Sequence, residues 1–116
     1  MTRVGVKMSK IKIADLEEVA EGQMIMRMHG DVQVLLARIE GEIYAMNDVC
    51  THEGAPLHEG RLGGEDNPCL LTCPWHEAHF DLRTGTVYQE TPWATDTETY
   101  PVTTEGGEIY VELEEE

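Results

Sequence analysis

The chain has 116 residues and a formal net charge of −15 at pH 7, with 8 Lys and Arg against 23 Asp and Glu. This length predicts one domain, and this charge disfavours nucleic acid and anionic membrane surfaces as partners. No apolar run approaches the length of a signal peptide or a membrane span, so we expect a cytoplasmic protein that does not enter a membrane.

The first half of the chain predicts strands joined by tight turns. Residues 11–14 are predicted as a short strand, followed by a helical turn that Asp15 caps and that ends at Gly22. Residues 23–48 are predicted as three strands. The turns between them fall at residues 29–31 and 40–42, where Gly or Asp tolerates the positive φ that a tight hairpin needs.

Apolar residues alternate within two of these predicted strands. Alternation with a period of two puts each set on one face of its strand. One set is Val32, Val34 and Leu36. The other is Met24, Met26 and Met28, and we interpret these methionines as core residues.

The second half of the chain predicts loops, short strands and two further hairpins. Residues 47–68 are predicted as loop, and residues 69–72 as a short strand. The hairpins are predicted around residues 83–85 and 105–107. Eleven glycines, five prolines and short apolar segments favour an all-β fold, and we expect a single domain over residues 1–116 because no repeat or linker divides the chain.

Each of two loops combines one cysteine with one histidine. Cys50 and His52 are one residue apart, and in an extended segment such residues face the same side at roughly 6–7 Å. Cys73 and His76 are two residues apart with Pro74 between them, a spacing that suits a turn aiming both side chains at one point. Together the loops supply two thiolates and two imidazoles.

This donor set suits zinc as well as iron. Structural zinc sites usually pair cysteine with cysteine and histidine with histidine, whereas each loop here holds a mixed pair. Mixed pairs match a 2Fe-2S centre in which two cysteines hold one iron and two histidines the other. A structural zinc site without a redox role stays open as the alternative, and colour and electron paramagnetic resonance distinguish the two.

The sequence "CTHEGAPLHEGRL" followed by "CPWHEAHFDLRTG", with a looser match through "YPVTTEGGEIYV", resembles the Rieske-type ferredoxins, including the ferredoxin components of ring-hydroxylating oxygenases. The resemblance implies an antiparallel β barrel or sandwich as basal domain, with a small cluster-binding subdomain inserted at about residues 47–84. It also implies one Rieske 2Fe-2S cluster per chain, bound by Cys50, His52, Cys73 and His76.

The resemblance further implies an electron carrier rather than an enzyme. We expect a soluble monomer that carries one electron from a flavin reductase to a terminal oxygenase. The alternative is a Rieske-type small subunit of a multi-subunit reductase, such as nitrite reductase. A third possibility, a sensor or vestigial cluster, has no support in the sequence.

Several residues near the motifs need separate interpretation. Cys69, four residues before Cys73, is predicted to be a small buried apolar residue, because a strand places such residues about 13 Å apart. His29 is predicted to be exposed in a turn, whereas His58 and His79 flank the motif loops and are interpreted as surface or packing residues.

The motifs depart from the family pattern at several positions. Glu77 stands where the family generally has glycine, and the 20 residues between His52 and Cys73 are a few more than usual. Respiratory-chain Rieske proteins carry two extra cysteines, a serine and a tyrosine at positions that hold Ala55, Trp75, Ala78 and Phe80 here. Without those hydroxyl donors we expect a reduction potential in the lower part of the Rieske range.

Overall fold

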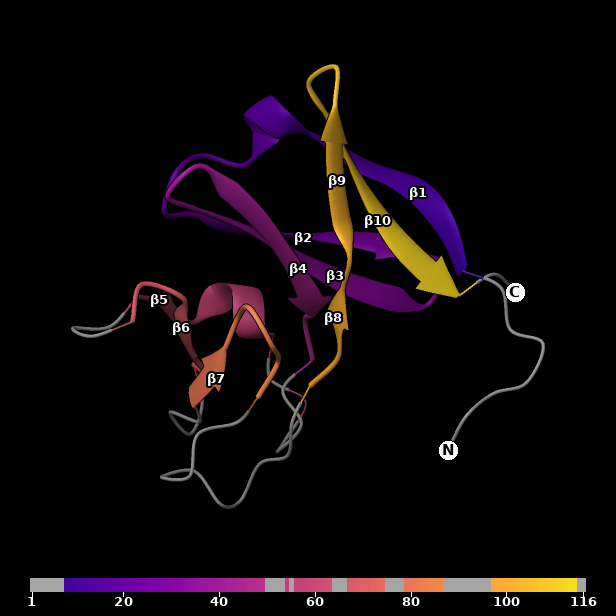
Figure 1. Cartoon of the computed structure of the whole chain (residues 1–116). Coiled ribbons are helices and arrows are strands. Elements are labelled where there is room, and N and C mark those ends of the chain that lie inside the picture. Colours follow the sequence, from indigo (N-terminus) through magenta and orange to yellow (C-terminus); the bar gives the residue numbers. More distant parts are fainter. Residues whose placement is uncertain are drawn as a thin grey trace.

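A computed structural model describes residues 8–49, 54, 56–63, 67–74, 79–86 and 97–114. Across these ranges the strands form three antiparallel sheets, and the helical segments are short 3-10 turns (Figure 1). The predicted all-β class is therefore confirmed. Within the same ranges, no helix has the length and apolar character required to cross a membrane.

The largest sheet has four strands in the order β2, β3, β4, β8. Their bounds are β2 (Met24–His29), β3 (Val32–Ile39), β4 (Glu42–Asn47) and β8 (Thr99–Tyr100). Both predicted turns are confirmed, because β2, β3 and β4 form two consecutive hairpins. At the second turn the carboxylate of Glu21 accepts hydrogen bonds from the backbone N–H groups of Glu40 and Gly41, at 2.6 and 2.9 Å. These bonds hold Glu40 at a φ of 52°, which non-glycine residues rarely adopt.

A second sheet of three strands joins the beginning and the end of the described chain (Figure 1). In the order β1, β10, β9, its strands are β1 (Met8–Asp15), β10 (Glu108–Glu114) and β9 (Val102–Glu105). The predicted hairpin around residues 105–107 is confirmed as the β9–β10 turn. The predicted strand at residues 11–14 is longer than expected, because β1 pairs with β10 from Met8 to Asp15, with a register shift between Lys12 and Ala14.

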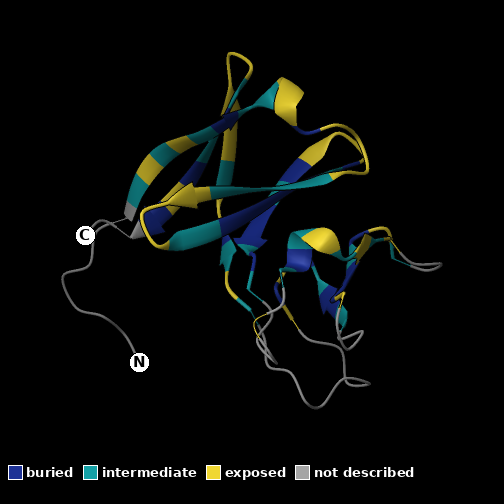
Figure 2. Ribbon diagram, turned by 180° about the vertical axis from the view of Figure 1, so that it is seen from behind, coloured by how far each residue is buried: buried dark blue, intermediate teal, exposed yellow. Residues whose placement is uncertain are grey.

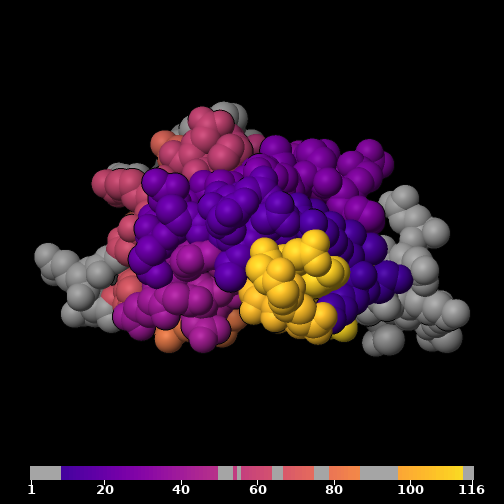
Figure 3. All heavy atoms as spheres, turned by 90° about the horizontal axis from the view of Figure 1, so that it is seen from above, coloured from indigo at the N-terminus to yellow at the C-terminus, as the bar shows by residue number. Residues whose placement is uncertain are grey.

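The 3-10 turn η1 (Leu16–Glu18) follows β1, and the backbone N–H of Leu16 donates a hydrogen bond to the carbonyl of Gly107 in the β9–β10 turn at 2.8 Å. Figure 3 shows the indigo N-terminal segment beside the yellow C-terminal hairpin. Asp15 occupies the N-cap as predicted, and its backbone N–H donates a hydrogen bond to the Glu18 carboxylate at 2.6 Å. The prediction that this turn ends at Gly22 is wrong. It ends at Glu18 because Val19 has an extended backbone and a fully buried side chain.

Strand β3 is buried on both faces, and each face contributes to a different hydrophobic core. Leu35 faces the cysteine core, which we define by its buried residues Leu35, Ala37, Ile39, Met46, Leu57, Cys69, Leu71, Cys73, Phe80 and Leu82. Leu36 faces the main core, which we define by Ala14, Val19, Val34, Leu36, Ile43, Ala45, Tyr100, Ile109, Val111 and Leu113. Figure 2 shows these buried residues as dark blue segments. The predicted alternation of Val32, Val34 and Leu36 is confirmed, since Val34 and Leu36 are buried in the main core and Val32 packs against it.

The three methionines of β2 are less buried than predicted. Met28 is 53% exposed, and Met24 and Met26 are half-buried. The core assignment is therefore wrong for Met28. The reason is the position of β2 at the edge of the four-stranded sheet, where β3 is its one partner among the described strands. Met24 is the methionine that packs against the cysteine core.

The third sheet is small and lies beside the end of the four-stranded sheet (Figure 1). In the order β5, β6, β7, its strands are β5 (Arg61–Leu62), β6 (Leu70–Thr72) and β7 (His79–Asp81), preceded by the 3-10 turn η2 (Leu57–Glu59). The strand predicted at residues 69–72 is confirmed as β6. The loop predicted over residues 47–68 contains η2 and β5. Strand β5 forms because Arg61 and Leu62 pair with β6. The returning strand of the hairpin predicted around residues 83–85 lies outside the described residues.

The chain leaves and re-enters the four-stranded sheet at neighbouring points. The backbone N–H of Asn47, the last residue of β4, donates a hydrogen bond to the carbonyl of Glu98 at 2.9 Å. Met46 and Thr99 are direct partners in the β4–β8 pairing. The small sheet therefore belongs to a long insertion between β4 and β8, residues 48–97, which we call the excursion. The two ends of the excursion lie next to each other.

Candidate metal centre

Both predicted motif loops start from described residues, but most of their own residues lie outside the described ranges. Cys73 lies within these ranges, whereas Cys50, His52 and His76 lie outside them. Among the described residues, no group of three or more His, Cys, Asp or Glu side chains is placed to hold a metal ion. The four-residue ligand set therefore stays a prediction, and the described residues define Cys73 and the bases of both loops.

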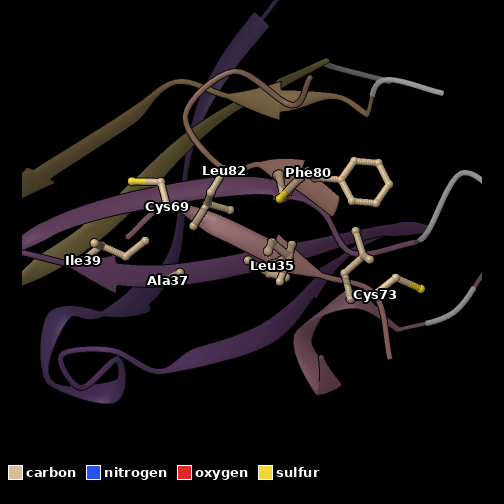
Figure 4. Packing of buried hydrophobic residues seen from close by; sticks show 10 residues of the cluster. Leu35, Ala37, Ile39, Cys69, Cys73, Phe80 and Leu82 are labelled. Carbon is tan, nitrogen blue, oxygen red and sulfur yellow. The ribbon is translucent and has the colours of Figure 1, made fainter. Parts of the chain in front are cut away.

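Cys73 directly follows β6, the central strand of the small sheet. Its side chain is 2% exposed and its thiol is not in a disulfide. It packs in the cysteine core, which also contains Leu57 and Phe80. Figure 4 shows Cys73 and Phe80 at the same end of that core. Apolar surroundings of this kind limit the access of water to a metal bound at the thiolate. Water access in turn affects the reduction potential of a metal site.

Cys69 lies at the opposite end of the same core, and Figure 4 shows the two thiols pointing away from each other. The side chain of Cys69 is 4% exposed, which confirms the prediction of a small buried apolar residue. Burial raises the pKa of its thiol, so the neutral form is favoured. Burial also raises the pKa of the Tyr44 hydroxyl, and the interaction of this hydroxyl with Cys69 acts in the same direction.

Asp48 closes the base of the first loop. This residue is fully buried, and its carboxylate accepts a hydrogen bond from the backbone N–H of His58 at 2.7 Å. The second carboxylate oxygen lies 2.7 Å from Nδ1 of the His58 ring. Burial raises the pKa of Asp48, and the hydrogen bonds from His58 act in the opposite direction.

A side-chain contact also joins the two sides of the second loop at its base. Thr72 of β6 and His79 of β7 are direct cross-strand partners, and Thr72 Oγ1 lies 3.0 Å from His79 Nδ1. At the end of β7, the carboxylate of Asp81 accepts hydrogen bonds from the backbone N–H and the guanidinium of Arg83, at 2.9 and 2.8 Å. Bonding to Arg83 lowers the pKa of Asp81. Both strands that flank the second loop are thus tied together next to Cys73.

The non-ligand histidines differ in their surroundings. His29 is exposed, as predicted. His58 and His79 are half-buried and hydrogen-bonded at the loop bases, which is a more specific placement than the predicted surface or packing role. Sequence reasoning did not single out Asp48, because an acid after an apolar strand is also the ordinary signal of a turn.

The family model described as "Rieske [2Fe-2S] domain" matches residues 9–101. The chain is 34% identical over 104 residues to the ferredoxin component of the naphthalene 1,2-dioxygenase/salicylate 5-hydroxylase systems of Ralstonia sp, covering 90% of this chain and 95% of the relative. It is 35% identical over 108 residues to the 3-phenylpropionate/cinnamic acid dioxygenase ferredoxin subunit of Shigella flexneri serotype 5b, covering 93% and 97%.

Solved structures share this fold. The ferredoxin of carbazole 1,9a-dioxygenase from Nocardioides aromaticivorans IC177 matches with a TM-score of 0.79 and 26% identity, covering 89% of this chain and 96% of the other. A chain from the complex of reduced oxygenase and oxidized ferredoxin in carbazole 1,9a-dioxygenase matches with a TM-score of 0.76 and 26% identity, covering 88% and 91%. A nitrite reductase small subunit from Mycobacterium tuberculosis, described as putative and NADH-dependent, matches with a TM-score of 0.79 but 21% identity, covering 92% and 96%, and shows the fold alone. The chain therefore belongs to the Rieske [2Fe-2S] domain family.

Proposed function

We propose that this protein is a one-electron carrier that serves an oxygenase, and not itself a catalyst. The observation that carries this proposal is the match to the Rieske [2Fe-2S] domain over residues 9–101, together with relatives named as ferredoxin components over nearly their full length. When bound, a 2Fe-2S cluster supplies one-electron chemistry.

The proposed ligands are the two thiols and two imidazoles of the motif loops, and the residues present fit such a cluster. Cys73 offers a buried thiol that is not in a disulfide. It directly follows β6, which pairs with β5 on one side and β7 on the other. Neutral imidazoles in place of two thiolates leave the site less negative, which favours acceptance of an electron. The proposed ligands are Cys50, His52, Cys73 and His76, within a subdomain at about residues 47–84.

The proposed partners are a terminal oxygenase as electron acceptor and a flavin reductase as donor. The complex of an oxygenase with a ferredoxin, whose chain resembles this one, supports the acceptor. We further propose that the protein works as a cytoplasmic monomer, and the free thiols of Cys69 and Cys73 fit a reducing compartment. The nitrite reductase alternative has weaker support, because that likeness shows the fold alone.

Electron transfer through the purified protein tests the proposal. A flavin reductase with NADH is expected to reduce the protein, and a terminal oxygenase is expected to reoxidise it, with one electron passed per chain. Because the net charge is −15, coupling rates are expected to fall or rise steeply with salt, as the Debye length shortens to about 8 Å at 0.15 M ionic strength. No reduction by any reductase, or co-elution with a reductase as a permanent subunit, would contradict the shuttle.

Phe80→Tyr is expected to raise the midpoint potential. The Phe80 ring is fully buried in the cysteine core, at the end occupied by Cys73 (Figure 4). A hydroxyl donated to a cluster sulfur stabilises the reduced, more negative state. The expected rise is tens of mV and at most about 60 mV, since about 59 mV for one electron corresponds to about 1.4 kcal/mol, the upper range for a neutral hydrogen bond.

A redox titration followed by electron paramagnetic resonance measures this shift. Phe80→Leu is the control, because it changes packing without adding a hydroxyl. The wild-type midpoint is expected below about +100 mV, in the lower part of the Rieske range. A tyrosine variant with an unchanged or lowered midpoint would contradict the proposed hydrogen bond.

A further inference from the structure

Within the described part of the chain, the buried carboxylate of Asp48 bonds to a residue on the far side of the first motif loop. Asp48 follows β4, before the loop, and both of its oxygens bond to His58, after the loop: one to the backbone N–H and the other to ring Nδ1, each at 2.7 Å. The side chain of Asp48 is 0% exposed, so water does not compete for these bonds. A carboxylate placed in this way costs free energy unless its partners are kept.

The backbone adds further ties at the same place. The N–H of Leu57 donates to the carbonyl of Asp48 at 2.7 Å, and Val49 and Pro56 form an antiparallel bridge. The N–H of Asp48 itself donates to the carbonyl of Gln33 in β3 at 2.9 Å. The loop therefore has a closed base, and that base is anchored to the four-stranded sheet.

The contact between Asp48 and His58 also connects the first loop to the surroundings of Cys73. His58 belongs to η2, and its neighbour Leu57 is fully buried in the cysteine core, where Cys73 also packs. A contact that fixes η2 against the end of β4 therefore fixes the first loop relative to the surroundings of Cys73. Cluster geometry depends on such outer contacts, because they orient the residues that hold the metal.

We infer that Asp48 and His58 form a positioning clamp that sets where the first motif loop presents Cys50 and His52 to the metal centre. This inference rests on the proposed ligand set. The clamp residues are positioning residues: they act through the backbone of the loop, not through contact with iron. Their loss loosens the loop base and leaves the fold of both large sheets in place.

The test uses the holoprotein and four variants. Asp48→Ala removes both side-chain bonds. His58→Ala removes the ring bond alone. Because His58 is half-buried, this second variant still tests the clamp if Asp48→Ala does not fold. His58→Asn restores an amide N–H close to the position of ring Nδ1 and is expected to rescue. Glu21→Ala is the control. The Glu21 carboxylate likewise accepts two hydrogen bonds, but both come from backbone N–H groups of the turn at the opposite end of β4.

Four measurements separate positioning from general stability. The rate of iron loss to a chelator is expected to rise about tenfold in Asp48→Ala and His58→Ala, as expected for the loss of a hydrogen bond to a charged group. The reduced-state electron paramagnetic resonance spectrum is expected to change in both, and deuterium exchange of residues 56–59 is expected to accelerate. Glu21→Ala is expected to change the unfolding temperature without changing the spectrum or the normalised rate of iron loss.

The outcomes distinguish the clamp from the proposed function. A wild-type protein without iron and labile sulfide overturns the proposed function, and the clamp with it. If the wild-type protein contains its cluster but the clamp variants show an unchanged spectrum and an unchanged rate of iron loss, the clamp alone is overturned. Equal effects of Glu21→Ala and His58→Ala also overturn it, because positioning would then not differ from general stabilisation.

Discussion

Cys73→Ala is expected to abolish stoichiometric iron binding, whereas Cys69→Ala keeps it. The two thiols form a matched pair, since both are buried, both are free, and both belong to the cysteine core. They differ in direction, because they point away from each other at opposite ends of that core (Figure 4). If Cys73 is a ligand, its removal leaves one iron with a single thiolate, which does not hold a 2Fe-2S cluster.

Elemental analysis for iron, zinc and labile sulfide measures this effect. Cys69→Ala removes one sulfur from the core and is expected to cost about 1 kcal/mol of stability without a change in iron content. Iron retained at the wild-type level in Cys73→Ala would remove Cys73 from the ligand set. Zinc in place of iron in the wild-type protein would favour the structural alternative.

Leu35→Ala and Leu36→Ala are expected to destabilise the protein by similar amounts but to affect the metal centre differently. Both leucines are fully buried in β3, so each truncation is expected to cost about 2–5 kcal/mol. Leu35 packs in the cysteine core with Cys73, whereas Leu36 packs in the main core. Leu35→Ala is therefore expected to accelerate cluster loss, and Leu36→Ala is expected to leave the visible spectrum of the folded protein unchanged.

Urea unfolding followed by far-ultraviolet and visible circular dichroism tests this pair. The far-ultraviolet midpoint reports the sheets and is expected to fall in both variants. The visible signal reports the metal centre and is expected to disappear at lower urea than the sheets in Leu35→Ala alone. Coincident loss of both signals in both variants would show that the two cores unfold as one unit and would contradict the distinction.

The sequence predicts the elements whose signals are local. Gly30 and Gly41 have φ values of 58° and 83°, so the turn residues that predict the two hairpins are the ones that the backbone needs there. The alternation in β3 likewise predicts its faces, because successive side chains of a strand point to opposite sides. The motif spacing predicts the ligand set independently of any described geometry.

Features that depend on distant pairing were not predictable. Strand β5 exists because Arg61 and Leu62 pair with β6, and nothing in two residues signals a strand. Met28 alternates like a core residue, but its exposure follows from the edge position of β2, which is a property of the whole sheet. Asp48 and His58 are ten positions apart, and their contact depends on how the intervening loop closes.

The hydrogen bond between Asn47 and Glu98 bears on how this architecture tolerates insertions and deletions. Because the two ends of the excursion are fixed against each other, residues can be added or removed inside it while β4 and β8 stay in register. The polymer cost of such changes is small, about 0.6 kcal/mol for each doubling of a flexible loop. Variation in length between the two motifs therefore costs little free energy and leaves the pairing of β4 with β8 unchanged.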